Sequence, residues 1–245
     1  MGPDQAVPAA PAGAAAPPVG RRVPRLGVRA PLVELCRERL RRTLGARMAF
    51  LFAAVTTLTF AVIAIAIRVA DGSDASFAGL IVQAARVVTW GAGSAVALAA
   101  AVDRRAVDRA EGIDMLAAVR GMPAYALDAA RALAAMVQTA VIIGVPVAIL
   151  SVLGVILSGS VFVAARQAGV GVAVMLYAVV AGVVLGAVAT AAGRYGGRRG
   201  RWVLLGVVVG PWIALDIAGR STWSIPGALD ALLELSVRLL SGARL

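Results

Sequence analysis

The 245-residue chain contains no lysine and no histidine, and its 24 basic residues are all arginines. Without lysine, the chain cannot supply the Walker A side chain that binds nucleotide phosphates, and it cannot form a Schiff base. Without histidine, it has no histidine metal ligand and no histidine general base. The single cysteine, Cys36, excludes a disulfide within the chain. These absences remove several classes of enzyme from consideration.

The chain is rich in apolar residues. Hydrophobic residues make up 60% of it, and its mean hydropathy is +0.88, whereas soluble domains contain about 45–50% apolar residues. We therefore expect an all-α integral membrane protein. The net charge of +11 comes from arginines that cluster beside apolar runs without interleaved aromatics. This pattern indicates topology signals and contact with anionic lipid, and no nucleic-acid partner is expected.

The composition divides the chain into four regions. Residues 1–26 are predicted to be a disordered Pro/Ala-rich tail, 27–47 an amphipathic interfacial helix, 48–218 a transmembrane domain, and 219–245 an amphipathic C-terminal helix. In the interfacial helix one apolar stripe is expected, formed by Leu32, Leu35, Cys36, Leu40 and Leu44. The alternative for this segment is a plain basic flank that only sets the topology.

Hydropathy predicts five spans, with a sixth left open. The five cover residues 48–70, 77–102, 132–157, 161–193 and 202–218, the last interrupted by Pro211. In the possible sixth, residues 225–241, the charged residues Asp230, Glu234 and Arg238 recur every four positions. This helix either lies on the outer surface or packs as a short sixth helix inside the bundle.

Arginine placement orients the spans. Nine arginines precede the first span and four lie in residues 194–201, so we expect a multi-pass protein with a cytoplasmic N-terminus. Two helix faces made of small residues are predicted to pack closely against other helices. One is formed by Gly91, Gly93 and Ser94, and the other by Gly182, Gly186 and Thr190, whose spacing is a weak dimerisation signal.

Two polar residues fall inside the second predicted span. Gln83 and Arg86 are candidates to line a pathway, because an arginine at membrane depth is a functional candidate. The equally weighted alternative is that Arg86 reaches outward or ties helices together as a structural element.

A charged stretch, Asp103–Arg131, separates the second and third spans. Its five arginines balance five acids, and Leu116, Val119 and Met122 can share one helix face. Gly121 is expected to break this helix, and Pro123 suits the first turn of the next. We therefore predict a cytoplasmic helix, a sharp turn, and a second helix that enters the membrane.

This stretch resembles the loop after the second span in permease subunits of ABC-2 type transporters. The positions that match are Glu111-Gly112, Leu116, Arg120-Gly121, Pro123 and Tyr125, within a resemblance that covers about residues 28–218. The resemblance implies a bacterial inner-membrane exporter subunit without catalysis of its own. ATP and Mg would bind a separate nucleotide-binding subunit, and this chain itself would carry no cofactor. Two permeases, as a homodimer or heterodimer, would form the pathway largely from their first, second and fifth spans.

The resemblance also makes the charged stretch a coupling helix that docks on the ATPase. The residues expected to dock are Arg109, Glu111, Gly112, Asp114, Leu116, Arg120, Gly121 and Tyr125. Gly112 is interpreted as a close-approach glycine within this surface. The competing interpretation is that the charges pair inside the loop, for example Asp108 with Arg104. The chain departs from the family at its carboxyl end, where a charged amphipathic helix stands in place of a clear sixth span.

Three other functions compete with this expectation. An integral membrane enzyme would need acid–base groups or a nucleophile at membrane depth, and a secondary transporter would need titratable residues near the bilayer centre. In the sequence, acids are found at span ends only. A non-transporting membrane scaffold is the third alternative. The spans do not identify a transported substrate.

Overall fold

The computed structural model describes residues 29–71, 76–102 and 125–241, together with residues 112, 113, 115, 119 and 123. All regular structure within these residues is helical. Four helical stretches are long and apolar enough to cross a membrane, namely Leu44–Ala70, Phe77–Ala100, Tyr125–Ile156 and Val161–Ile217. The described part of the chain is thus all-helical and of the multi-pass membrane type, and the predicted spans 161–193 and 202–218 both fall within the last of these stretches.

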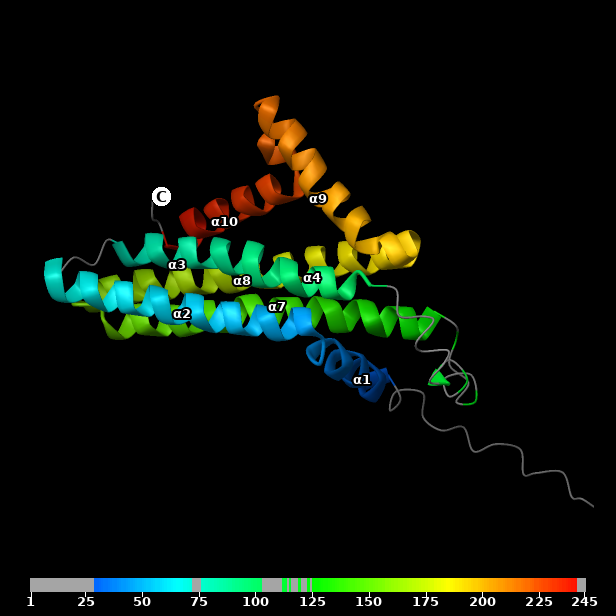
Figure 1. Cartoon of the computed structure of the whole chain (residues 1–245). Helices are drawn as coiled ribbons and strands as arrows, with labels where there is room; N and C mark the ends of the chain where they lie inside the picture. The colour runs from blue at the N-terminus through cyan, green and yellow to red at the C-terminus, as the bar shows by residue number, and fades with distance from the viewer. Residues whose placement is uncertain are drawn as a thin grey trace, which may run out of the picture.

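Long helices lie side by side along one axis and form the bundle (Figure 1). They are α2 (Leu44–Asp71), the run of α3 (Ser76–Val88), η2 (Thr89–Gly93) and α4 (Ser94–Ala100), then α7 (Tyr125–Ile156) and α8 (Val161–Gly196). The turn between α7 and α8 is short. Ser160 caps α8 by accepting a hydrogen bond from the Val163 backbone N–H at 3.3 Å.

Glycines set the closest helix contacts in the bundle. A Cβ on Gly182 would lie 2.5 Å from the Cβ of Ala140, and one on Gly186 would lie 2.6 Å from the Cα of Met136. The predicted small-residue face therefore packs α8 against α7 within the chain. The second predicted face also packs closely, because a Cβ on Gly91 would overlap the ring of Phe52 in α2.

Helix α1 (Arg29–Arg41) lies against one flank of the bundle. Leu40 is buried, and Arg37 Nε donates a 3.2 Å hydrogen bond to Gln138 Oε1 of α7. Of the leucines in the predicted apolar stripe, Leu40 faces the bundle, whereas Leu35 and Leu44 are exposed. The hydrogen bond from Arg37 is the polar contact that the structure shows between α1 and α7.

Helix α9 (Gly200–Ile217) leaves the bundle after the 3-10 turn η3 (Gly197–Arg199). It rises away from the other helices at an angle (Figure 1), and residues 210–214 are all exposed. The predicted interruption at Pro211 was wrong, since the helix continues through this residue. A proline on an exposed helix face can be accommodated by local adjustment when neighbouring groups satisfy the lost backbone bond.

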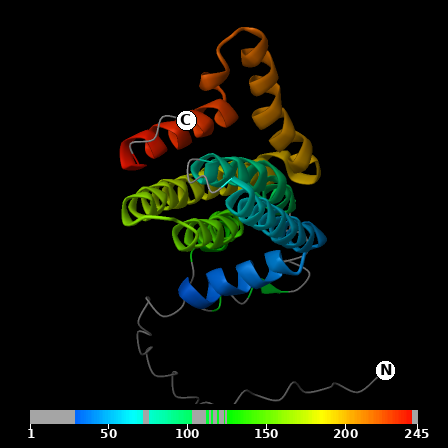
Figure 2. The ribbon, with the colours of Figure 1, turned by 90° about the vertical axis from the view of Figure 1, so that its left-hand side faces the viewer.

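After the 3-10 turn η4 (Ser221–Trp223), α10 (Ile225–Ser241) returns to the bundle. It packs chiefly against α8, and Leu229, Leu233 and Val237 are buried in the same core as residues of α3 and α8. Figure 2 shows α10 and α1 on opposite flanks of the bundle. Helix α10 therefore contributes to the core, as in the packed alternative for this segment.

Candidate functional site

The predicted coupling segment joins α4 to α7. Six of its expected docking residues lie outside the described residues: Arg109, Glu111, Asp114, Leu116, Arg120 and Gly121. The alternative pairing of Asp108 with Arg104 falls outside them too. Gly112 and Tyr125 are described, as are three neighbours, Ile113, Met115 and Val119, which are helical.

The described part of this segment exposes apolar side chains. Met115 is 75% exposed and Val119 81% exposed, whereas Ile113 is buried. Met115 and Val119 are four positions apart in the sequence, which is the spacing of neighbours on one face of a helix. Tyr125, at the start of α7, is also exposed. Met115 is not among the docking residues predicted from the sequence.

Gly112 has a conformational requirement that the sequence did not indicate. Its φ of +70° places it in the left-handed region, which residues other than glycine adopt at a cost. The space around its Cβ position is open among the described residues, and the close approach to a partner stays a prediction. The glycine is required by the backbone conformation at the start of this helical segment.

The first turn of α7 carries a shared ion pair. Asp128 Oδ1 lies 2.9 Å from Arg131 Nη1, and Asp128 Oδ2 lies 3.8 Å from Arg194 Nη1 of α8. A carboxylate in the first turn of a helix is also favoured by the helix dipole. This cluster therefore ties the helix that follows the coupling segment to the end of α8. We call the end of the bundle that holds it the basic end.

A groove of about 400 Å³ opens beside this cluster. Its polar lining comes from Tyr125, Asp128, Arg131, Thr190, Arg194 and Tyr195, and alanines of α7 and α8 supply much of the rest. A smaller cavity of about 70 Å³ lies between α1, α4 and α7, and Arg131 and Thr190 line both spaces. The basic end is thus hollowed where the two longest helices separate.

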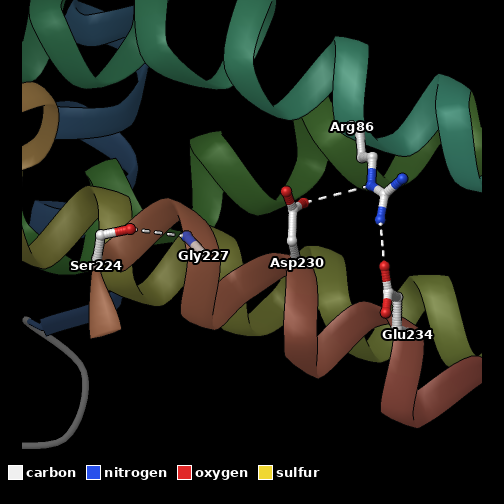
Figure 3. Close-up of polar contacts among 5 residues, drawn as sticks. All are labelled: Arg86, Ser224, Gly227, Asp230 and Glu234. Carbon is white, nitrogen blue, oxygen red and sulfur yellow. Dashed lines mark hydrogen bonds and ion pairs between the residues drawn. The ribbon is translucent and has the colours of Figure 1, made fainter. Parts of the chain in front are cut away.

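A second polar cluster links α3 to α10 (Figure 3). Arg86 Nη2 donates a hydrogen bond to Glu234 Oε1 at 3.0 Å, and Arg86 Nε lies 3.4 Å from Asp230 Oδ1. Arg238 extends the cluster, with its Nη2 3.9 Å from Glu234 Oε2. Asp230 and Glu234 of α10 therefore face Arg86 of α3, and Arg238 pairs with Glu234 within α10.

Two buried hydroxyl groups lie close to this cluster. Tyr177 and Thr89 are fully buried, and their hydroxyl groups lie close to each other. Tyr177 is close enough to Asp230 and Arg86 for their charges to act on its hydroxyl group. Sequence reasoning missed these two residues, because an isolated tyrosine or threonine in an apolar run gives no signal of what it faces.

Gln83 and Arg86, the two predicted pathway residues, have different surroundings. The Arg86 side chain is 27% exposed and paired, whereas Gln83 is exposed. The contact seen for Arg86 is the helix tie that the sequence left as an alternative. Among the described ranges, no group of three or more cysteine, aspartate or glutamate residues is placed to hold a metal ion.

No family model matches this chain, and no curated protein or solved structure matches it either. The class that the fold defines is a helical protein with stretches able to cross a membrane several times.

Proposed function

We propose that the chain is the membrane-spanning permease subunit of an ABC-2 type exporter. ATP binding and hydrolysis occur on a separate nucleotide-binding subunit, which docks on the segment between α4 and α7. The permease acts as a homodimer or heterodimer in the bacterial inner membrane, with the basic end and the N-terminus in the cytoplasm. The residue pattern from Glu111 to Tyr125 is the source of the family assignment.

One structural observation carries the docking part of this proposal. Met115 and Val119, two apolar residues of the segment, are both largely exposed and are spaced four positions apart. Apolar side chains at i and i+4 are the anchors with which a helix fits a groove on a partner. The charged residues on either side of them in the sequence, Asp114 and Arg120, would then set register more than affinity.

The contacts of α7 support the transmission of a displacement from this segment to the membrane domain. The segment leads into α7, a helix of 32 residues that packs along α8. The Asp128–Arg131–Arg194 cluster and the Arg37–Gln138 hydrogen bond attach α8 and α1 to the same helix. Rigid-body displacement of α7 would therefore move its neighbours with it.

Paired aspartates test the docking face. The variant Met115→Asp with Val119→Asp should lose the co-purifying ATPase in detergent, because two charges cannot enter an apolar groove without a large desolvation cost. We expect at least a tenfold loss of bound ATPase, which corresponds to about 1.4 kcal/mol. The measurement is affinity purification of the tagged chain, followed by quantification of the ATPase subunit.

The matched control is Val161→Asp with Phe162→Asp. These residues are equally exposed, 87% and 81%, but begin α8 at the opposite end of the bundle. This control should retain the ATPase. Equal retention by both double variants would refute docking through Met115 and Val119, and absence of any ATPase from the wild-type preparation would refute the permease assignment.

A secondary transporter is the second candidate, and the Arg86 cluster is the observation that favours it. Arg86 is nine residues beyond Phe77, so it lies about 14 Å along a span that crosses about 30 Å of hydrocarbon. Two carboxylates next to an arginine at this depth resemble the ionisable sites of ion-coupled transporters. Substrate uptake or efflux in proteoliposomes, driven by an ion gradient without an ATPase, would establish this candidate over the first.

A further inference from the structure

The groove at the basic end has the shape of a slot between two separating helices. α7 and α8 touch where Gly186 meets the backbone of Met136, and the groove occupies the side of this contact nearer to Tyr125 and Arg194. Along α7 it extends from Tyr125 to Met136, eleven residue steps or about 16 Å. Its volume of about 400 Å³ lies within the range of small-molecule sites.

Two arginines and one aspartate line the outer end of the groove: Arg131, Arg194 and Asp128. The Asp128–Arg194 pair is the looser one at 3.8 Å, and the Arg194 side chain is 54% exposed. An incoming anion could therefore take Arg194 as a ligand without breaking the 2.9 Å pair between Asp128 and Arg131.

The walls below these charges are apolar. The side chains there are Ala129, Ala132 and Met136 from α7, with Ala187 and Ala191 from α8. Two tyrosines, Tyr125 and Tyr195, stand at the mouth and are both exposed, and tyrosine is enriched at the level of lipid headgroups. The ligand that fits these surfaces has a negatively charged head and a hydrocarbon tail.

We propose that the groove between the Tyr125 end of α7 and the Arg194 end of α8 binds one anionic phospholipid. Its headgroup phosphate is held by Arg194 and Arg131, and an acyl chain lies along the alanine walls. Basic pockets between membrane helices on the cytoplasmic side bind such headgroups in general. The site does not depend on the proposed function, because it uses neither the docking face nor an ATPase.

The test measures lipid binding to the purified full chain by native mass spectrometry. Phosphatidylglycerol is titrated against phosphatidylcholine of the same acyl composition, and inorganic phosphate at the same concentration is a separate arm. The wild type should prefer phosphatidylglycerol by about tenfold. Arg131→Gln with Arg194→Gln should abolish this preference. The matched control, Arg198→Gln with Arg201→Gln, removes two exposed arginines that do not line the groove and should keep the preference within about twofold.

A second variant keeps every charge and fills the slot instead. Ala187→Phe should weaken phosphatidylglycerol binding at least about tenfold, because the ring occupies the space of the acyl chain. Wild-type preference in both Ala187→Phe and the Arg131/Arg194 variant would overturn the proposal. An equal loss in the Arg198/Arg201 control would also overturn it, as would inorganic phosphate competing as strongly as the lipid.

Discussion

Arg86 shows how one residue can join helices far apart in sequence. Its guanidinium group lies between Asp230 and Glu234, 144 and 148 positions further along the chain. An ion pair that is partly exposed contributes little, but removing one member of a partly buried cluster leaves the others without compensation. The side chains of Arg86, Asp230 and Glu234 are 27%, 40% and 43% exposed. The contribution of this cluster to stability should therefore lie between that of a surface ion pair and that of a buried one.

Replacement of Arg86 by alanine should lower the free energy of unfolding by about 1–2 kcal/mol. Denaturant titration in detergent checks this value. The control is Arg166→Ala, which removes an exposed arginine of α8 and should change stability by less than about 0.5 kcal/mol. If the double exchange Arg86→Glu with Glu234→Arg were no more stable than Arg86→Glu alone, the pairing would not be the source of the effect.

At this scale the sequence identified Arg86 and the i, i+4 charges of α10 separately. It did not join them, because a charged stripe on a short helix is equally compatible with a water-facing surface. Tyr177 and Thr89 carried no signal, since their burial depends on which helix packs over them. Gly112 was recognised as special, but a positive φ can be read only from the backbone.

At the scale of elements, glycines distinguish packed helices from the protruding one. Gly182 and Gly186 in α8 touch α7, whereas Gly206 and Gly210 in α9 have no atom within 4 Å of an added Cβ. Hydropathy predicted where the helices of the bundle lie, because long apolar runs leave little choice in a membrane. It could not predict the direction of α9, which depends on the positive-φ Gly197 and the 3-10 turn η3.

Replacement by alanine should have opposite effects on stability at a packed glycine of α8 and at an open glycine of α9. Gly182→Ala should destabilise the protein by about 1–3 kcal/mol, because the new methyl group overlaps the backbone of Ala140. Gly206→Ala in α9 should be neutral or stabilising by up to about 1 kcal/mol, since alanine favours the helix and meets nothing. Thermal unfolding in detergent compares both with the wild type. A destabilising Gly206→Ala would show that α9 packs closely against another surface.

At the scale of the whole molecule, arginines gather at one end. Arg131, Arg194 and residues 198–201 lie where α7 begins and α8 ends, and the α7–α8 turn at Ser158–Ser160 lies at the opposite end. The positive-inside rule predicts that the basic end faces the cytoplasm, and the proposed ATPase would have to reach the 112–125 segment from there. The central claim of the account is this orientation together with the accessible docking face.

Cysteine labelling in intact cells tests that claim most directly. In a Cys36→Ser background, Gly159→Cys should react with a membrane-impermeant maleimide from outside, whereas Val119→Cys should react only after the membrane is permeabilised. Both positions are exposed in the structure, so a difference in labelling reports the side of the membrane. Labelling of Val119→Cys in intact cells would contradict the account, because no cytoplasmic ATPase could then act on the segment.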